Sequence, residues 1–359
     1  MEQRTRAALA GVAIGVIFLL VQLGALALVE PFKSGGFQTV EDTSDPTNSV
    51  LYVGLLLVAT AGMLAAIKYD AEWVIRAVIV FTGGYITLIV LGQILPASLL
   101  GIGGISALAW LGGAAVFLGL IFYPEWWVID ASGIVMGAGA AGMFGVNFGV
   151  LPALVLLIVL AVYDAISVYG TEHMLTLASG VMDLKVPVVL VVPLSLSYSF
   201  LDAEAPDPTD DGDDDAVSDA AEPDENRVAA DGDGESGDAT ADTGDADDDN
   251  TEAPDPMDRE ALFIGLGDAV IPTVLIASAA FFAPPEAALG VPGLALTLPA
   301  LTAMIGTMIG LAVLLTMVLR GRAHAGLPLL NGGAIGGYLL GALLSGISLI
   351  EALGLAPYL

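Results

Sequence analysis

The chain is built mainly of long apolar stretches separated by short polar segments. A bilayer core of about 30 Å is crossed by a helix of about 20 residues, and such stretches are typical of membrane-spanning helices. Nine are predicted, at Ala7–Val29, Val50–Ile67, Val74–Leu95, Leu99–Phe122, Trp127–Phe148, Leu151–Val168, Ala261–Phe282, Leu294–Leu319 and Leu327–Leu353. The first is too long for a signal-peptide core and is interpreted as a retained helix. The pattern therefore predicts an all-α, multi-pass membrane protein.

The positions of Lys and Arg predict the orientation of these spans. Cytoplasmic loops of membrane proteins carry an excess of both residues. With a cytoplasmic N-terminus, nine spans place every base except Lys33 on the cytoplasmic side. One span more or fewer in the middle would disrupt this alternation. We therefore expect the N-terminus inside and the C-terminus outside.

Composition agrees with a membrane protein except in one segment. Mean hydropathy is +0.82, and the formal charge is −30. Residues 202–260 hold 25 of the 40 acidic residues, and Arg227 and Arg259 are their only bases. So polar a segment cannot bury enough apolar surface to fold, and it is predicted to be a disordered cytoplasmic spacer. The expected organisation is a membrane part over 1–200, the acidic loop over 201–260 and a second membrane part over 261–359.

The segment Val186–Phe200 is apolar but unlike the spans. It has only about 15 residues, is rich in β-branched side chains, and is interrupted by Pro187 and Pro193. These features favour an extended or re-entrant segment over a helix. Glu172–Lys185, just upstream, is predicted to form a short interfacial helix.

Few ionisable residues fall inside the spans, and such residues usually mark function because they are costly there. Asp164 and Asp268 lie well within the sixth and seventh spans. They are about four and seven residues from the predicted cytoplasmic ends, or roughly 6 and 10 Å deep at 1.5 Å per residue. Asp130 is interpreted as an ordinary interfacial acid, and Glu351 as reaching water near the outer end of its span.

Two carboxylates at one depth on neighbouring helices fit acid–base hydrolysis. Such a pair shares one proton, so that one member activates water and the other protonates the scissile carbonyl. The chain has no cysteine, and His173 and His324 have no second ligand at metal-site spacing, so a thiol or zinc protease is not expected. A proton-coupled transporter and a catalytically silent membrane scaffold stay open as alternatives on the residues alone.

Three motifs give the pattern a family resemblance. They are Tyr163-Asp164, Gly265-Leu266-Gly267-Asp268 and Pro328-Leu329-Leu330, in the sixth, seventh and ninth spans. Together with the long loop between the aspartates, they make the chain resemble the presenilin and signal peptide peptidase family, in particular its archaeal (haloarchaeal-like) members. The resemblance implies an intramembrane aspartyl endopeptidase with Asp164 and Asp268 as its catalytic pair. It also implies transmembrane polypeptides or remnant signal peptides as substrates, which enter laterally and pair with an extended segment before the seventh span. Val186–Phe200 is the candidate for this segment, because it is rich in β-branched residues and interrupted by proline.

The flanking residues have more specific expected roles. Gly265 and Gly267 are predicted to let backbone or substrate approach Asp268, with Leu266 between them as part of the motif. Tyr163 either hydrogen-bonds near the pair or lines the bundle. The resemblance assigns substrate positioning to Pro328, Leu329 and Leu330, although the family usually has alanine where Leu329 stands. Gly332 and Gly336 form a small-residue pair predicted to pack against another helix.

The remaining expectations concern partners and location. We expect no cofactor and no metal, because two carboxylates and water suffice for the hydrolysis. The expected partners are transmembrane polypeptides and the lipid bilayer, with no nucleic acid, and the sequence does not indicate an oligomeric state. The expected location is the cell membrane.

Overall fold

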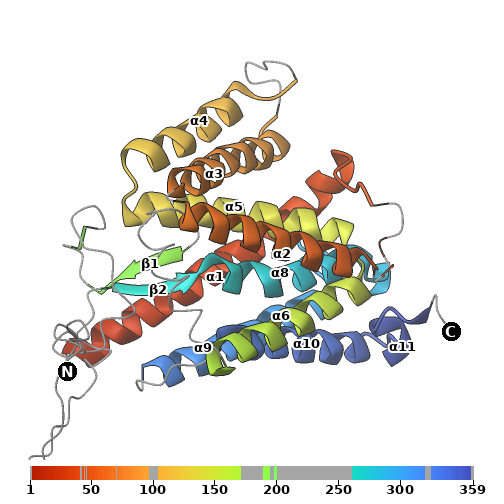
Figure 1. Cartoon of the computed structure of the whole chain (residues 1–359). Helices are drawn as coiled ribbons and strands as arrows, with labels where there is room; N and C mark the ends of the chain where they lie inside the picture. The colour runs from red at the N-terminus through yellow and green to blue at the C-terminus, as the bar shows by residue number, and fades with distance from the viewer. Residues whose placement is uncertain are drawn as a thin grey trace, which may run out of the picture.

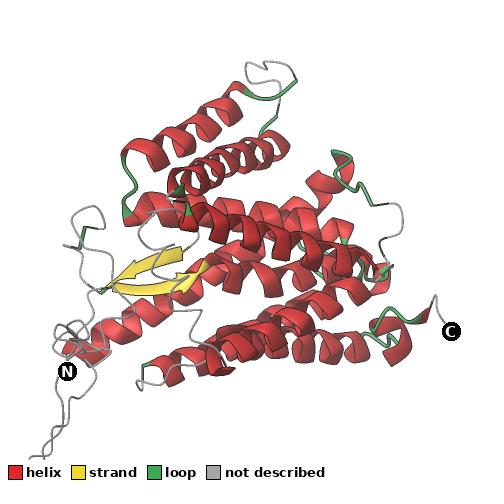
Figure 2. Ribbon diagram, viewed as in Figure 1, coloured by secondary structure: helices red, strands yellow, loops and turns green. Residues whose placement is uncertain are grey.

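The computed structural model describes residues 2–40, 43, 45, 47–69, 71–96, 104–170, 189–194, 198–199, 261–319 and 325–356. Within these residues the protein is a bundle of long helices with one small two-stranded sheet at one end (Figures 1 and 2). The acidic loop, His173, His324 and the predicted interfacial helix Glu172–Lys185 lie outside the described residues.

The described residues form nine helices of 16 or more residues. They are α1 Glu2–Ser34, α2 Thr47–Lys68, α3 Glu72–Ile94, α4 Ala107–Phe122, α5 Trp126–Asn147, α6 Val150–Gly170, α8 Leu266–Phe282, α9 Leu298–Val318 and α10 Gly326–Leu344. Seven of them are long and apolar enough to cross a membrane, whereas α4 and α8 are shorter. The predicted helical, multi-pass membrane fold is confirmed.

The helices are arranged around α1, α5 and α8. The α3–α4 pair lies on one side of these helices, and α6, α9 and α10 lie on the other (Figure 1). The largest buried cluster joins side chains of α6, α8, α9 and α10, which places the core at the helices that carry both candidate aspartates. α2 is mostly exposed, and its Tyr52 packs edge-on against Phe144 of α5.

The predicted seventh span begins differently from the expectation. Ala261–Gly265 is not helical but forms strand β2, so α8 begins only at Leu266. β2 pairs antiparallel with β1, Val189–Pro193, in the register Val189↔Gly265 to Pro193↔Ala261. The extended structure predicted within Val186–Phe200 is thus confirmed for β1. The apolar run of the seventh span includes strand β2 because β1, which is distant in the sequence, pairs with it.

The ribbon is buried on both faces, and this explains its continuous apolar sequence. Leu190, Val192 and Leu262 face one cluster with α1, α9 and α10. Val191 and Ala261 face another with α3, α4 and α5. Successive strand residues point to opposite faces, so both sets are apolar and no alternation is visible.

The predicted ninth span is two helices. α10 ends at Leu344, Gly346 follows with φ of 75°, and α11, Leu349–Ala352, begins after the N-cap Ser348. Ser348 and Glu351 form a capping box, which satisfies backbone N–H groups at the new helix start. Glu351 is exposed, as expected.

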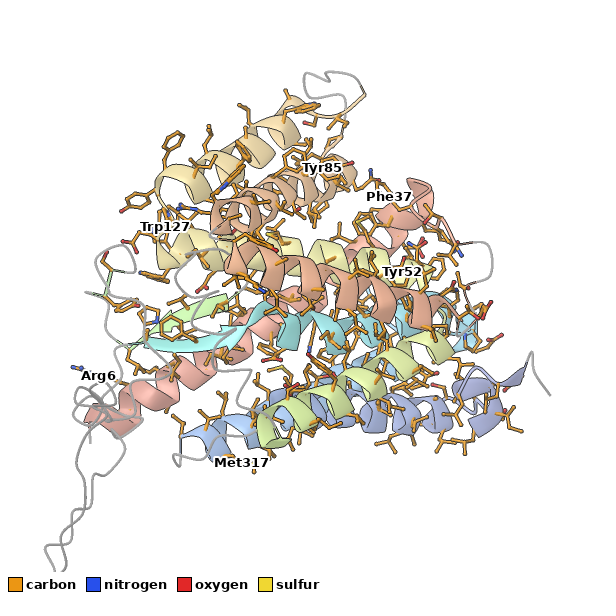
Figure 3. The ribbon with its side chains drawn as sticks, in the orientation of Figure 1. Arg6, Phe37, Tyr52, Tyr85, Trp127 and Met317 are labelled. Atoms are coloured by element: carbon orange, nitrogen blue, oxygen red, sulfur yellow. The ribbon has the colours of Figure 1, made fainter. Side chains whose placement is uncertain are left out.

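The α9–α10 interface is a close helix contact in the core and is lined by glycines. Gly306 of α9 faces Gly333 and Gly337 of α10, and Gly310 of α9 faces the backbone of Leu329 and Leu330. An added Cβ at any of these four glycines would collide with backbone of the opposite helix. The predicted packing pair Gly332 and Gly336 is wrong by one residue, because both are exposed and a Cβ on either would meet nothing within 4 Å. Figure 3 places Arg6 and Trp127 at the ribbon end of the bundle and Phe37 at the opposite end.

Candidate active site

Asp164 lies on α6, six residues before the helix ends at Gly170. Its side chain is only 9% exposed, and its Oδ2 accepts a hydrogen bond of 3.0 Å from the backbone N–H of Leu327. Leu327 is the second residue of α10, whose N-cap, Ala325, provides no side-chain cap. The first N–H groups of a helix have no partner within it, so Asp164 caps α10 from a neighbouring helix.

Asp268 is the third residue of α8, in its first turn, rather than about seven residues into a longer helix. The predicted position within a helix was wrong because Ala261–Gly265 is a strand. The positive end of a helix dipole favours a carboxylate at this position. Pro272, four residues later, has no N–H to bond the Asp268 carbonyl, so the helix is locally less constrained at the aspartate.

The start of α10 brings the two aspartates together. Gly326 lies against Asp268, since a Cβ on this glycine would be 3.6 Å from Oδ2 of Asp268. The next residue, Leu327, bonds Asp164. The carboxylates are close enough to interact electrostatically. Two helices separated by the acidic loop therefore present their acids to one short piece of backbone.

The arrangement can carry out acid–base chemistry on a polar bond. Asp164 is buried and fixed by a directed N–H, whereas Asp268 is partly exposed. Two neighbouring carboxylates hold one proton between them at low energetic cost, which supplies an acid and a base in one place. No cluster of three or more potential metal ligands occurs among the described residues.

Of the other residues predicted for the site, some lie beside the aspartates and others do not. Gly265 is beside the pair, because a Cβ there would lie 3.5 Å from Oδ2 of Asp268. Gly267 is exposed, and a Cβ on it would approach only Ile271, at 3.9 Å. Tyr163 is 50% exposed, and no hydrogen bond joins it to either aspartate within the part of the chain that the structure describes.

The remaining motif residues support helix packing. Leu266 packs towards α5 at Gly137, where an added Cβ would lie 3.2 Å from its Cδ1. Pro328 is the third residue of α10, in the turn where a missing N–H is tolerated. Leu329 and Leu330 pack in the cluster with α1, α9 and the ribbon. The larger side chain at position 329 is therefore accommodated in the core cluster beside the site.

Two residues near the site were missed or misread from the sequence. Gly326 precedes the recognised motif, and only the meeting of α8 and α10 shows that it touches Asp268. Asp130, interpreted from the sequence as an ordinary interfacial acid, is only 7% exposed and accepts a 2.8 Å hydrogen bond from Val191 N–H in β1. The burial of Asp130 could have been predicted from its place inside an apolar stretch. Its hydrogen-bond partner, Val191, could not have been predicted from the sequence.

Gly326 gives a direct test of the packing around the pair. We expect Gly326→Val to lower kcat by about tenfold or more, because its branches would crowd Asp268 and Leu314, whose Cδ2 would already be 3.3 Å from a Cβ. Cleavage rates of purified variants measure this. Gly332→Val, on the exposed face of the same helix, is the matched control and should leave kcat within about twofold. Equal rates for both variants would contradict the placement of Gly326.

Comparisons with known proteins identify the family of the chain. The family model described as signal-peptide peptidase, presenilin aspartyl protease matches residues 15–347. The chain belongs to this family. Like other family members, it is an intramembrane aspartic endopeptidase and a multi-pass membrane protein. The comparison with curated proteins gives no significant match.

Two similar solved structures extend the match to three dimensions. Both are of a presenilin family intramembrane aspartate protease, one in space group C222 and one in space group P2. The first is 30% identical in sequence, and its match covers 93% of the present chain and 99% of the solved chain, with a TM-score of 0.59. The second is 29% identical, covers 92% and 97%, and has a TM-score of 0.56. The likeness includes both membrane parts of the chain.

Proposed function

We propose that Asp164 and Asp268 are the catalytic pair and hydrolyse peptide bonds within or near transmembrane segments. The observation that carries this proposal is that both carboxylates lie beside consecutive residues at the start of α10. Gly326 lies against Asp268, and Leu327 N–H bonds Asp164. One carboxylate activates a water molecule as the nucleophile, and the other protonates the scissile carbonyl. This mechanism requires no cofactor.

The proposed supporting roles follow from the packing. Gly265 leaves space beside Asp268 for a substrate backbone, since its missing side chain would stand 3.5 Å from the carboxylate. Leu329 and Leu330 hold the start of α10 in the core, and Pro328 is the third residue of this helix. Together they keep Leu327 N–H on Asp164. The geometry gives less support to a role of Tyr163 and Gly267 in the active site, because both residues are exposed.

The proposed substrates are transmembrane polypeptides or remnant signal peptides. Substrate would enter from the bilayer beside α2, a span with no buried residue in its apolar window that contacts α6, the helix of Asp164. An unwound substrate would then add a strand to the β1–β2 ribbon, which leads directly into Asp268. The sequence-based hypothesis assigned this pairing to Val186–Phe200. Because β1 already pairs with β2, we now assign it to the ribbon as a whole.

The proposed topology keeps the nine spans expected from the sequence. α4 and α8, though short, would also cross the bilayer, and β2 would continue α8 at its cytoplasmic end. The alternation of basic residues supports a cytoplasmic N-terminus and an outer C-terminus in the cell membrane.

The test is the cleavage of a transmembrane peptide by the purified protein in detergent. We expect defined products by mass spectrometry with the wild type and none with Asp164→Ala or Asp268→Ala. Cleavage that survives either change would contradict the catalytic pair. A folded wild type that cleaves no tested transmembrane peptide would favour the scaffold alternative. Proton-coupled solute uptake by reconstituted vesicles would favour the transporter.

A further inference from the structure

Asp130 is a buried acid that the catalytic proposal does not use. It is the fifth residue of α5 and is 7% exposed. Its Oδ1 accepts the Val191 N–H of β1 at 2.8 Å, so its partner is a backbone amide on another element. A carboxylate in such a place costs free energy unless it is hydrogen-bonded. The bond therefore ties the ribbon to α5.

The hydrogen bond lies on the outer edge of β1. In an antiparallel pair, the N–H groups of successive residues point alternately towards and away from the partner strand. Because Val191 N–H reaches Asp130, this side of Val191 faces away from β2. Pro193, two residues later, lies on the same side and has no N–H, as expected for an outer edge. Asp130 thus accepts the hydrogen bond of the N–H group that Val191 presents at this edge.

This contact is connected to the catalytic pair through a short path. β1 pairs with β2 up to Val189↔Gly265, and Gly265 is the N-cap of α8. Asp268 follows three residues later. A shift of β1 along or away from α5 would therefore move the start of α8 and, with it, the carboxylate. Figure 1 shows the ribbon running into α8 at the end of the bundle where α5 begins.

A second acid at the start of α5 holds the same segment. Glu125, the N-cap of α5, is 7% exposed, and its Oε1 accepts a 2.6 Å hydrogen bond from Ser199 Oγ. Ser199 lies six residues after the end of β1. The chain is thus tied to the first turns of α5 at β1 and again beyond it.

We propose that Asp130 is a positioning residue for the protease reaction. It fixes β1 on α5, so that β2 delivers Asp268 to Asp164 and the start of α10. The inference rests on the proposed function, in which these two aspartates are the catalytic pair. The role needs a hydrogen-bond acceptor at this position and no negative charge, which separates it from a role in proton transfer.

The experiment compares Asp130→Ala and Asp130→Asn in the purified full chain with a transmembrane peptide substrate. We expect Asp130→Ala to lower kcat by about 10²-fold with KM nearly unchanged, as a displacement of about 1 Å at the site would. Asp130→Asn keeps the acceptor Oδ1 and should recover kcat to within about threefold of the wild type. Ser132→Ala is the control, because it removes a buried hydroxyl whose hydrogen bond, among the described residues, is to Ile129 O of the same helix.

The outcomes are distinguishable. Equal losses in Asp130→Ala and Asp130→Asn, an unchanged kcat in Asp130→Ala, or an equal loss in Ser132→Ala would each overturn the proposal. If Asp130→Ala does not fold, Asp130→Ser, whose hydroxyl is too short to reach Val191, should show the same loss of kcat. Failure of both to fold would assign Asp130 to stability instead. An inactive wild type or an active Asp164→Ala would refute the catalytic pair and, with it, this role, whereas the outcomes above, with an active wild type and an inactive Asp164→Ala, refute this role alone.

Discussion

Replacing either aspartate by its amide is expected to lower kcat by at least about 10³-fold while the protein stays folded. Asn at position 164 keeps an oxygen that can accept Leu327 N–H, so α10 should remain capped. Asn at position 268 keeps the shape of the side chain beside Gly265 and Gly326. Each change removes a carboxylate that can exchange a proton, and an acid and a base are both needed. Product formation with a transmembrane peptide, followed by mass spectrometry, measures the loss.

Thermal unfolding in detergent provides the control for the two amide variants. We expect unfolding midpoints close to the wild type, because the contacts of both side chains are retained. Substrate binding should also persist, which can be followed by cross-linking of a labelled peptide. Turnover within tenfold of the wild type in either variant would exclude that aspartate from the chemistry.

The second large effect is expected at the interface of α9 and α10. Gly333→Ala should destabilise the protein by about 1–3 kcal/mol and lower activity, because the new methyl would collide with the backbone carbonyl of Gly306. The helices must then separate. Since α10 begins at Gly326, its N-terminus would be displaced relative to both aspartates. Thermal unfolding and cleavage rates, measured on one preparation, test both parts.

The neighbouring glycine is the matched control for this prediction. Gly332 is exposed, and a Cβ there meets nothing within 4 Å. Gly332→Ala should therefore be neutral or stabilising by up to about 1 kcal/mol, because alanine is the better helix former. If Gly333→Ala and Gly332→Ala had the same effect, the close contact at Gly306 would be wrong.

The apolar pattern predicted most helices but not their ends. Ala261–Gly265 is as apolar as the helix that follows, so hydropathy could not separate β2 from α8. The strand exists because β1 lies beside it and both faces are covered. The division of the last span into α10 and α11 depended on local backbone geometry at Gly346 and Ser348.

The sequence by itself determined a multi-pass helical membrane protein, its protease family and the two acids that stand out within its spans. These follow from stretch length, from the cost of charge in lipid and from short motifs, all of which are local properties. Only the tertiary structure decided what surrounds the pair. It placed Asp268 in a first helical turn, put Gly326 and Leu327 against the carboxylates, and buried Asp130 beneath β1. These contacts join residues far apart in the chain, and no local pattern encodes which backbone group a buried carboxylate will meet.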